Sequence, residues 1–300
     1  MEVQKYLMRS LMFVPGHNEK LIASAAKSDA DVILLDVEDS VMPAENKQLA
    51  RDMIKKHIKE KTFKNFDVFI RLNEIESGFL LQDVLQLTLE GVTGFLLSKT
   101  NTADDVVFLD KLLEVIEIEK KLPTGYFKII PILETAASIV NANEIAQASR
   151  RVISIGFGSE DFVSNLEGIR DFGIDSSLFT PRAWVAMVAR THKIIPIDAA
   201  YINVHDMEGL EKHLKVGKTL GYAGMWVLHP KQNELVNKYY GLTEEEIAEA
   251  NEILALADEA IQLNKGVAII NGKFIGPPLV VKAKNIINKQ KLIDSKKNDD

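Results

Sequence analysis

Eight short apolar segments alternate with helical patterns along the first 230 residues, and this alternation limits the possible folds more than any other feature. The segments recur about every 30 residues, as expected of βα units. They are apolar on both faces, as in Val32-Ile33-Leu34-Leu35, which is typical of parallel strands covered on each side by helices. The predicted strands are residues 10–14, 31–35, 67–72, 94–97, 127–133, 152–157, 193–197 and 225–228.

Eight such units predict the α/β class and, within it, a closed TIM (β/α)8 barrel, whose chemistry lies at the C-terminal ends of the strands. A doubly wound open sheet is the alternative. It is less favoured because no Gly-x-Gly-x-x-Gly turn follows the first strand, and Gly156-Phe157-Gly158 is only a fragment of that motif.

The alternation stops after Pro230. Thr243 and Glu246 form a capping box ahead of an apolar stripe that runs from Ile247 to Ile261. An extended pair is expected around Asn271-Gly272, a tight-turn dipeptide, followed by a last helix from about Pro278.

These patterns predict three parts of the chain. Residues 1–230 form the barrel domain, and residues 231–288 form a C-terminal helical extension with a hairpin. Residues 289–300 form a polar, frayed tail. We expect the extension to pack on the barrel or on a neighbouring subunit, because its helix is apolar on one face.

Composition excludes several classes of function. The chain has 300 residues and no cysteine, so disulfides, thiolate metal sites and cysteine nucleophiles are excluded. The net charge of −7 argues against a nucleic-acid or membrane-surface partner. No segment of 18 apolar residues is present, and the N-terminus lacks the layout of a signal peptide. We therefore expect a soluble, cytoplasmic protein.

Two acidic residues follow neighbouring predicted strands. Glu134 ends one apolar segment and Asp161 follows the next, 27 residues later, which is about one strand, one helix and one strand. In a parallel sheet this spacing places both at the same edge, with backbones about 5 Å apart. The sequence has no cysteine and no paired-histidine motif, so the candidate ligands are oxygens, which favour Mg²⁺ or Mn²⁺.

Arg71 ends another predicted strand, and an arginine beside a divalent cation suits a carboxylate or 2-keto acid. Such a site favours making or breaking a C–C bond next to a carbonyl. Each residue also has a structural interpretation. Arg71 could pair with Glu38 or Asp39, Asp161 could cap the next helix, and Lys99 could be a solvated lysine.

An ordered set of motifs resembles the citrate lyase β-subunit-like family of the HpcH/HpaI aldolase superfamily. The motifs are Arg9–Gly16 with Glu19-Lys20, Leu35–Val41, Ile70–Asn73, Pro131–Ala136, Gly158–Phe162, Ile197-Asp198 and Leu228–Gln232. With the C-terminal segment they extend from about residue 9 to 285, nearly the whole chain.

The resemblance implies a TIM barrel, a Mg²⁺ at Glu134 and Asp161, and an arginine at Arg71 that binds the keto-acid moiety. Members of the family cleave or form 3-hydroxy-acyl thioesters, of the citryl, malyl or citramalyl type, carried on coenzyme A or an acyl carrier protein. Homotrimers or hexamers are implied, alone or with other lyase subunits, with the C-terminal segment closing over a neighbouring site.

Two positions depart from the family pattern. Many members have an acid/base aspartate in the C-terminal segment, where this chain has Gly276. A glycine cannot transfer a proton, and such a group contributes typically 10²–10⁴ in rate. The family's Pro-Lys after the fourth strand is Ser98-Lys99 here.

The expected site therefore has the following roles. Glu134 and Asp161 bind the metal, and Arg71, Glu38 and Asp39 are catalytic. The substrate-binding residues are Arg71, Glu134, Pro15 and Gly16. Two alternatives are a keto-acid-binding paralogue that lost turnover with the change at Gly276, and a Schiff-base aldolase that uses Lys99 as nucleophile.

Overall fold

The computed structural model describes residues 5–170, 177–262, 268–270 and 273–298. The chain divides into two compact units. One unit is Met8–Tyr240, and the other combines Met1–Leu7 with Gly241–Asp300.

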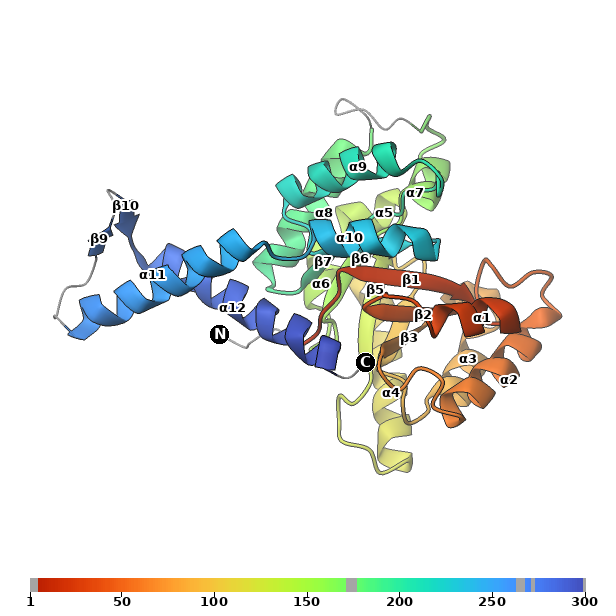
Figure 1. The fold of residues 1–300 in the computed structure, drawn as a ribbon. Coiled ribbons are helices and arrows are strands. Elements are labelled where there is room, and N and C mark those ends of the chain that lie inside the picture. Colours follow the sequence, from red (N-terminus) through yellow and green to blue (C-terminus); the bar gives the residue numbers. More distant parts are fainter. Residues whose placement is uncertain (1–4, 171–176, 263–267, 271–272, 299–300) are drawn as a thin grey trace. The chain divides into compact units, whose positions relative to one another are not determined.

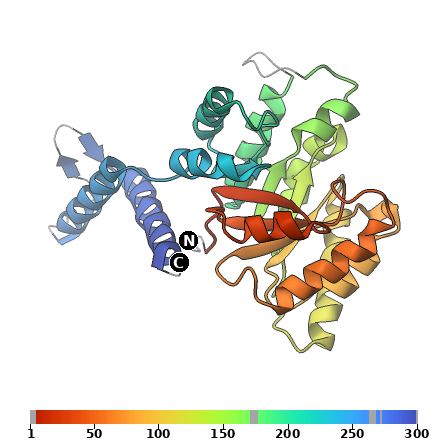
Figure 2. The same ribbon diagram turned by 45° about the vertical axis from the view of Figure 1, so that its right-hand side comes forward.

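Eight parallel strands of the first unit close into a barrel in the order β1 to β8, with β8 paired to β1. The helices surround the strands (Figures 1 and 2). The predicted TIM barrel is confirmed. The strands are β1 (Ser10–Pro15), β2 (Val32–Asp36), β3 (Asp67–Leu72), β4 (Gly94–Leu97), β5 (Lys128–Leu133), β6 (Ser154–Phe157), β7 (Ile195–Asp198) and β8 (Gly224–Val227).

The strands form where the sequence is apolar on both faces. Every residue of β2 is buried, including the terminal Asp36. The other strand bounds lie within one residue of the prediction, but β6 begins at Ser154 and not at Val152, and β7 begins at Ile195 and not at Lys193. Lys193 has a positive φ of 59° and lies in the turn that ends the preceding helix, so it cannot continue the strand.

The helices and short 3₁₀ turns of this unit cover the barrel, and side-chain caps fix several of their starts. Asn18 and Asp206 each accept a hydrogen bond from a backbone N–H of the helix that they precede. The elements are α1 (Glu19–Ala25), α2 (Asn46–Lys59), η1 (Ile75–Ser77), α3 (Leu80–Leu87), α4 (Ala103–Glu119), α5 (Ala136–Val140), α6 (Ala142–Gln147), α7 (Ser159–Asn165), α8 (Phe179–Thr191), α9 (Met207–Leu220), η2 (Pro230–Gln232) and α10 (Asn233–Tyr239).

Helix α10 belongs to the barrel unit, so this unit extends past the expected boundary at residue 230. The helix packs on β1 and β8. Val236 is fully buried, and the Ser10 hydroxyl donates a hydrogen bond to Asn237 Oδ1 at 2.8 Å. No sequence pattern marks this helix, because seven residues are too few to show a clear apolar period.

The second unit contains two long helices, α11 (Glu244–Gln262) and α12 (Pro277–Asn298), which pack against each other. The predicted capping box is present, since the backbone N–H of Thr243 donates to Glu246 Oε2 and that of Glu246 donates to Thr243 Oγ1. Residues 289–298, expected to be frayed, are helical because α12 continues to Asn298.

A two-stranded antiparallel sheet joins these helices in the chain. Strand β9 (Ala268–Ile270) pairs with β10 (Lys273–Ile275), as the extended pair in the sequence predicted. The Asn271-Gly272 turn lies outside the described residues. None of the described helices is both long enough and apolar enough to cross a bilayer.

The barrel interior is filled by side chains, and one glycine makes this packing possible. A Cβ on Gly156 of β6 would lie 1.9 Å from the Trp226 ring of β8. Trp226 is buried, and its ring centre lies 5.6 Å from that of Phe13, with the two rings tilted by 50°. Its indole N–H donates to the carbonyl of Phe157 at 3.0 Å. A larger residue at 156 would therefore displace a fixed ring.

We predict that Gly156→Ala destabilises the protein by about 1–3 kcal/mol, the range found for overpacked cores. Urea unfolding followed by tryptophan fluorescence measures the change. Gly168→Ala is the matched control, because its Cβ would meet its nearest neighbours only at 3.7 Å and beyond. Equal stability of the two variants would contradict this account of the barrel interior.

Candidate active site

The C-terminal ends of successive strands bring the predicted polar residues to one rim of the barrel. Asp36 is the last residue of β2, and Arg71 lies in β3. Lys99 is the second residue after β4, and Glu134 directly follows β5. Asp161 lies in the first turn of α7, after β6.

Arg71 is held by a bidentate ion pair with Asp36. Arg71 Nε donates to Asp36 Oδ1 at 2.8 Å and Nη2 donates to Oδ2 at 2.5 Å. The two residues are register partners on neighbouring strands, so the pairing follows directly from the barrel. The Arg71 guanidinium also lies 4.8 Å from the centre of the Phe13 ring, close enough for a cation–π contact.

Asp36 is an ionised, fully enclosed partner of Arg71. Burial by itself would raise the pKa of Asp36, but the charge and hydrogen bonds of Arg71 outweigh it, so the pKa lies below its ordinary value. The backbone N–H and hydroxyl of Ser40 also donate to its Oδ2, and the N–H of Glu38 donates to its Oδ1. Asp36 thus fixes both Arg71 and the loop after β2.

Glu38 and Asp39 contact Arg71 as well. Arg71 Nη1 lies 3.0 Å from Glu38 Oε2 and 3.4 Å from Asp39 Oδ2. Glu38 is buried, whereas the Asp39 side chain is 54% exposed. Burial raises the pKa of Glu38 to about 7, against the opposing charge of Arg71. The expected pairing of Arg71 with Glu38 or Asp39 is thus present, but as an addition to the pair with Asp36.

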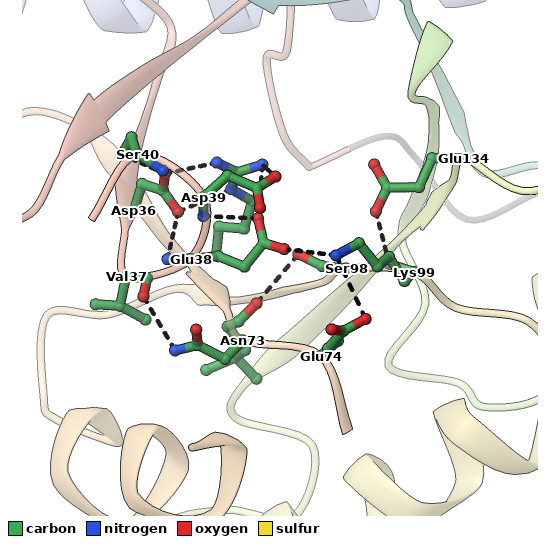
Figure 3. A network of polar contacts seen from close by, with 12 residues as sticks. Asp36, Val37, Glu38, Asp39, Ser40, Asn73, Glu74, Ser98, Lys99 and Glu134 are labelled. Atoms are coloured by element: carbon green, nitrogen blue, oxygen red, sulfur yellow. Dashed lines mark hydrogen bonds and ion pairs between the residues drawn. The ribbon is translucent and has the colours of Figure 1, made fainter. Parts of the chain in front are cut away.

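Two buried side chains hold the backbone of the loop that presents Glu38. The Lys47 ammonium donates to the carbonyls of Val37 and Glu38 at 2.9 and 2.6 Å. The Asn73 amide donates to the Val37 carbonyl at 3.0 Å (Figure 3). Because the Lys47 and Asn73 side chains are themselves buried, the loop cannot move Glu38 away from Arg71 without breaking these hydrogen bonds.

Lys99 contacts two carboxylates and is not simply solvated. Its Nζ lies 3.5 Å from Glu38 Oε1 and 3.4 Å from Glu74 Oε2 (Figure 3). Partial burial would lower the pKa of Lys99, but the charges of Glu38 and Glu74 outweigh it, so the pKa lies above its ordinary value. A protonated amine is not a nucleophile, so this environment disfavours the Schiff-base alternative.

Glu134 is a buried carboxyl group, and within the described ranges its hydrogen-bond partner is a backbone N–H and not a cationic side chain. Its Oε1 accepts a hydrogen bond from the backbone N–H of Lys99 at 2.6 Å. Burial raises the pKa of Glu134 to about 8, and the negative charge of Asp161 adds to this rise. The two acids are thus close enough to repel each other.

Asp161 is partly buried, in the first turn of α7. It is not the N-cap of this helix, because Gly158 occupies that position. Gly158 also lets Glu134 approach closely, since a Cβ there would lie 2.7 Å from Glu134 Oε2. The capping interpretation of Asp161 is therefore wrong, and its carboxylate remains available for a ligand.

The chemistry of Glu134 and Asp161 fits a magnesium ion. Mg²⁺ is commonly held by one or two carboxylates, with water and substrate oxygens completing its shell. Burial is the main cause of the raised pKa of Glu134, and a cation would offset both this burial and the repulsion from Asp161. Within the described ranges, no three histidine or acidic side chains are arranged to hold a metal.

Pro15 and Gly16 form the turn after β1. Pro15 is the register partner of Asp36, and the backbone N–H of Gly16 donates to the Asp36 carbonyl at 2.8 Å. A Cβ on Gly16 would lie 2.6 Å from that carbonyl oxygen. The need for glycine here is explained by this close contact between β1 and β2, and substrate binding by the turn stays a prediction.

Asp36 and Glu74 take part in the site although no site role was predicted for them, and Lys99 takes part as an ion-pair partner of two acids and not as the nucleophile of the Schiff-base alternative. The signal for Asp36 was its position at the end of a strand beside the strand that bears Arg71. No comparable signal marks Glu74, because its contact with Lys99 depends on the path of the loop after β3.

Comparison with known proteins shows sequence similarity over nearly the whole chain. Residues 9–230 match the model of the HpcH/HpaI aldolase/citrate lyase family. The chain is 32% identical over 295 residues to the citrate lyase subunit beta of Leuconostoc mesenteroides subsp. cremoris, covering 97% of each chain. It is 31% identical over 309 residues to the L-malyl-CoA/beta-methylmalyl-CoA lyase of Rhodobacter capsulatus, covering 95% of each.

Solved structures share the fold. A citrate lyase of Burkholderia xenovorans LB400 superimposes with a TM-score of 0.82 at 18% identity, over 96% of this chain and 93% of that one. The CitE protein of Mycobacterium tuberculosis, solved with magnesium, acetoacetate and coenzyme A, gives a TM-score of 0.72 at 23% identity, over 95% and 98%.

We predict that Asp36→Asn destabilises the protein by about 3 kcal/mol at pH 7, because it leaves Arg71, whose side chain is only 13% exposed, without its main partner. Asp39→Asn, which removes an exposed partner of the same arginine, should cost less than about 1 kcal/mol. Urea unfolding measures both changes.

The effect of Asp36→Asn should depend on pH. Because the pKa of Asp36 lies below its ordinary value of 3.8, the stabilisation is fully present above that pH and is lost as the pH falls further. The difference in the free energy of unfolding between wild type and Asp36→Asn should therefore become smaller in acid. A loss of stability that is equal for Asp36→Asn and Asp39→Asn, or that does not change with pH, would argue against the ion pair between Asp36 and Arg71.

Proposed function

The chain belongs to the HpcH/HpaI aldolase/citrate lyase family, and we propose that it is a magnesium-dependent carbon–carbon lyase. Its substrate would be a 3-hydroxy-acyl thioester of the citryl, citramalyl or malyl type, on coenzyme A or an acyl carrier protein. The products would be a 2-keto acid and an acyl thioester. The observation that supports this most strongly is the rim itself, where Arg71 of β3 shares one end of the barrel with two mutually repelling carboxyl groups, Glu134 after β5 and Asp161 after β6.

Glu134 and Asp161 would hold Mg²⁺, with Mn²⁺ as a possible substitute. When bound, the ion polarises the carbonyl that forms on the keto acid and stabilises its developing negative charge. Glu134 is suited to this role because its free oxygen Oε2 is held in place by the hydrogen bond that the Lys99 N–H makes to Oε1.

Arg71 would bind the carboxylate of the keto acid. A guanidinium has five N–H groups. Among the described residues, Asp36 accepts from Nε and Nη2 and Asp39 accepts from Nη1, while Glu38 forms an ion pair with Nη1. One N–H of Nη2 is left for the substrate. The three acids fix the orientation of the guanidinium before the substrate arrives, which reduces the entropy lost on binding.

The cleavage step requires two proton transfers. A base accepts the proton of the C3 hydroxyl, the C2–C3 bond breaks, and its electron pair passes to the thioester as an enolate. The C3–O bond becomes the carbonyl of the keto acid, and the enolate is protonated at C2. We assign the first transfer to Glu38, because a carboxyl group with a pKa of about 7 exchanges protons near neutral pH.

A second candidate function is a binding or assembly subunit that holds the keto acid without turnover. Gly276 favours this candidate, because the position has no side chain that could serve as an acid or base. In either case we propose a homo-oligomer, a trimer or hexamer, alone or with other lyase subunits.

We predict that Glu134→Gln abolishes Mg²⁺ binding measured by calorimetry, because a neutral amide replaces one of two charged ligands. The control is Glu160→Gln, which neutralises an exposed acid beside Asp161 and should keep the wild-type affinity. Unchanged Mg²⁺ affinity in Glu134→Gln would reject this metal site.

We predict that the wild type cleaves citramalyl-, malyl- or citryl-thioesters in the presence of Mg²⁺, and that Gly276→Asp accelerates this reaction by 10-fold or more because it adds a proton-transfer group. Release of the 2-keto acid, coupled to its reduction, measures the rate. Keto-acid binding by a wild type that cleaves none of these thioesters, with activity appearing only in Gly276→Asp, would support the binding subunit instead.

A further inference from the structure

Lys99 has a backbone conformation that its position in the fold does not explain. Its φ is +47°, in the left-handed region that side chains other than glycine rarely adopt. Among the described residues, four other non-glycine residues have a positive φ, and each lies two positions after the last residue of a helix: Lys61, Lys121, Glu167 and Lys193. Left-handed residues commonly end helices, but Lys99 follows a strand.

The unusual backbone of Lys99 accompanies a direct contact with the proposed metal ligand. Its N–H donates to Glu134 Oε1 at 2.6 Å, and Glu134 is otherwise enclosed. Strained backbone persists where the surrounding structure fixes it, and such residues are concentrated at functional sites. The local conformation at Lys99 is thus linked to the orientation of one carboxyl group.

The side chain of the same residue reaches the other half of the rim. Its Nζ lies 3.5 Å from Glu38 Oε1, while Arg71 Nη1 lies 3.0 Å from Glu38 Oε2. Glu38 is therefore held between two cations, one on each oxygen. Glu74 is a second partner of Lys99, at 3.4 Å, and its side chain is 39% exposed.

We propose that Lys99 is a positioning residue that joins the two halves of the site, its backbone N–H orienting Glu134 and its ammonium holding Glu38 so that Arg71 stays available for a keto acid. This inference rests on the proposed function, because it assigns Glu134 to the metal and Arg71 to the substrate carboxylate.

The charges on the rim give this proposal a distinctive consequence. Six carboxyl groups face three cationic side chains: Asp36, Glu38, Asp39, Glu74, Glu134 and Asp161 with Arg71, Lys99 and the buried Lys47. Loss of the Lys99 charge would leave Arg71 as the one ion-pair partner of the Glu38 carboxylate among the described residues and would increase the negative excess. Binding of the keto-acid anion should then weaken, whereas binding of Mg²⁺ should stay equal or become tighter.

Damage to the fold would instead weaken the binding of both pyruvate and Mg²⁺. A loss of pyruvate affinity without a loss of Mg²⁺ affinity therefore distinguishes a positioning role from a structural one. The experiment uses the full chain and calorimetry with two probes, Mg²⁺ alone and pyruvate at saturating Mg²⁺. Lys99→Met keeps the length of the side chain without its charge, and Lys99→Arg keeps the charge. Lys111→Met is the matched control, because Lys111 is 69% exposed and pairs only with Glu114 in the described structure.

We expect Lys99→Met to weaken pyruvate binding about 10-fold without loss of Mg²⁺ affinity. Lys99→Arg should keep most of the wild-type pyruvate affinity, and Lys111→Met should change neither the pyruvate nor the Mg²⁺ affinity. Should Lys99→Met fail to fold, Lys99→Gly serves in its place, because glycine adopts the left-handed conformation without strain.

Three results would overturn the inference. Unchanged pyruvate affinity in Lys99→Met, or parallel loss of Mg²⁺ and pyruvate, would reject Lys99 as a positioning residue and leave the proposed function intact. A wild type that shows no Mg²⁺-dependent pyruvate binding would reject the proposed function, and the role of Lys99 with it.

Discussion

The ion pair between Arg71 and the buried Asp36 is the interaction on which the rest of the rim depends. It joins the ends of β2 and β3 through two hydrogen bonds, at 2.8 and 2.5 Å, between register partners. Moving a guanidinium out of water is costly unless its donors are satisfied. Glu38 and Asp39 lie on the remaining side of Arg71, so the loop after β2 that bears them follows the position of this one cation.

The other half of the rim, formed by Glu134 and Asp161, has negative charge that no neighbouring arginine pairs with in the described structure. Glu134 is buried beside the charge of Asp161, and its pKa is raised to about 8. An arrangement that is unfavourable by itself becomes favourable when a divalent cation binds, since the cost of bringing the two acids together is met by the ion. The two halves thus differ: in one the acids already pair with Arg71, and in the other two acids lie together where a metal could bind.

The sequence predicted the barrel well because alternation and apolar strands are local patterns. It also predicted that Glu134, Asp161 and Arg71 lie at one rim, as they do, because the ends of parallel strands must share one edge. The partners of these residues were harder to predict from the sequence. The role of Asp36 depends on the register between β2 and β3, and that of Lys99 depends on a left-handed backbone, neither of which a single sequence displays. The extension of the barrel unit to Tyr240 likewise depends on tertiary packing of α10.

The most direct test of the account is a crystal structure of the full chain grown with Mn²⁺ and a 2-keto acid, with the ion located by its anomalous scattering. We expect one ion bound by carboxylate oxygens of both Glu134 and Asp161, at about 2.2 Å, with the keto acid between the ion and Arg71. An ion bound elsewhere, or held by only one of these two acids, would contradict the account.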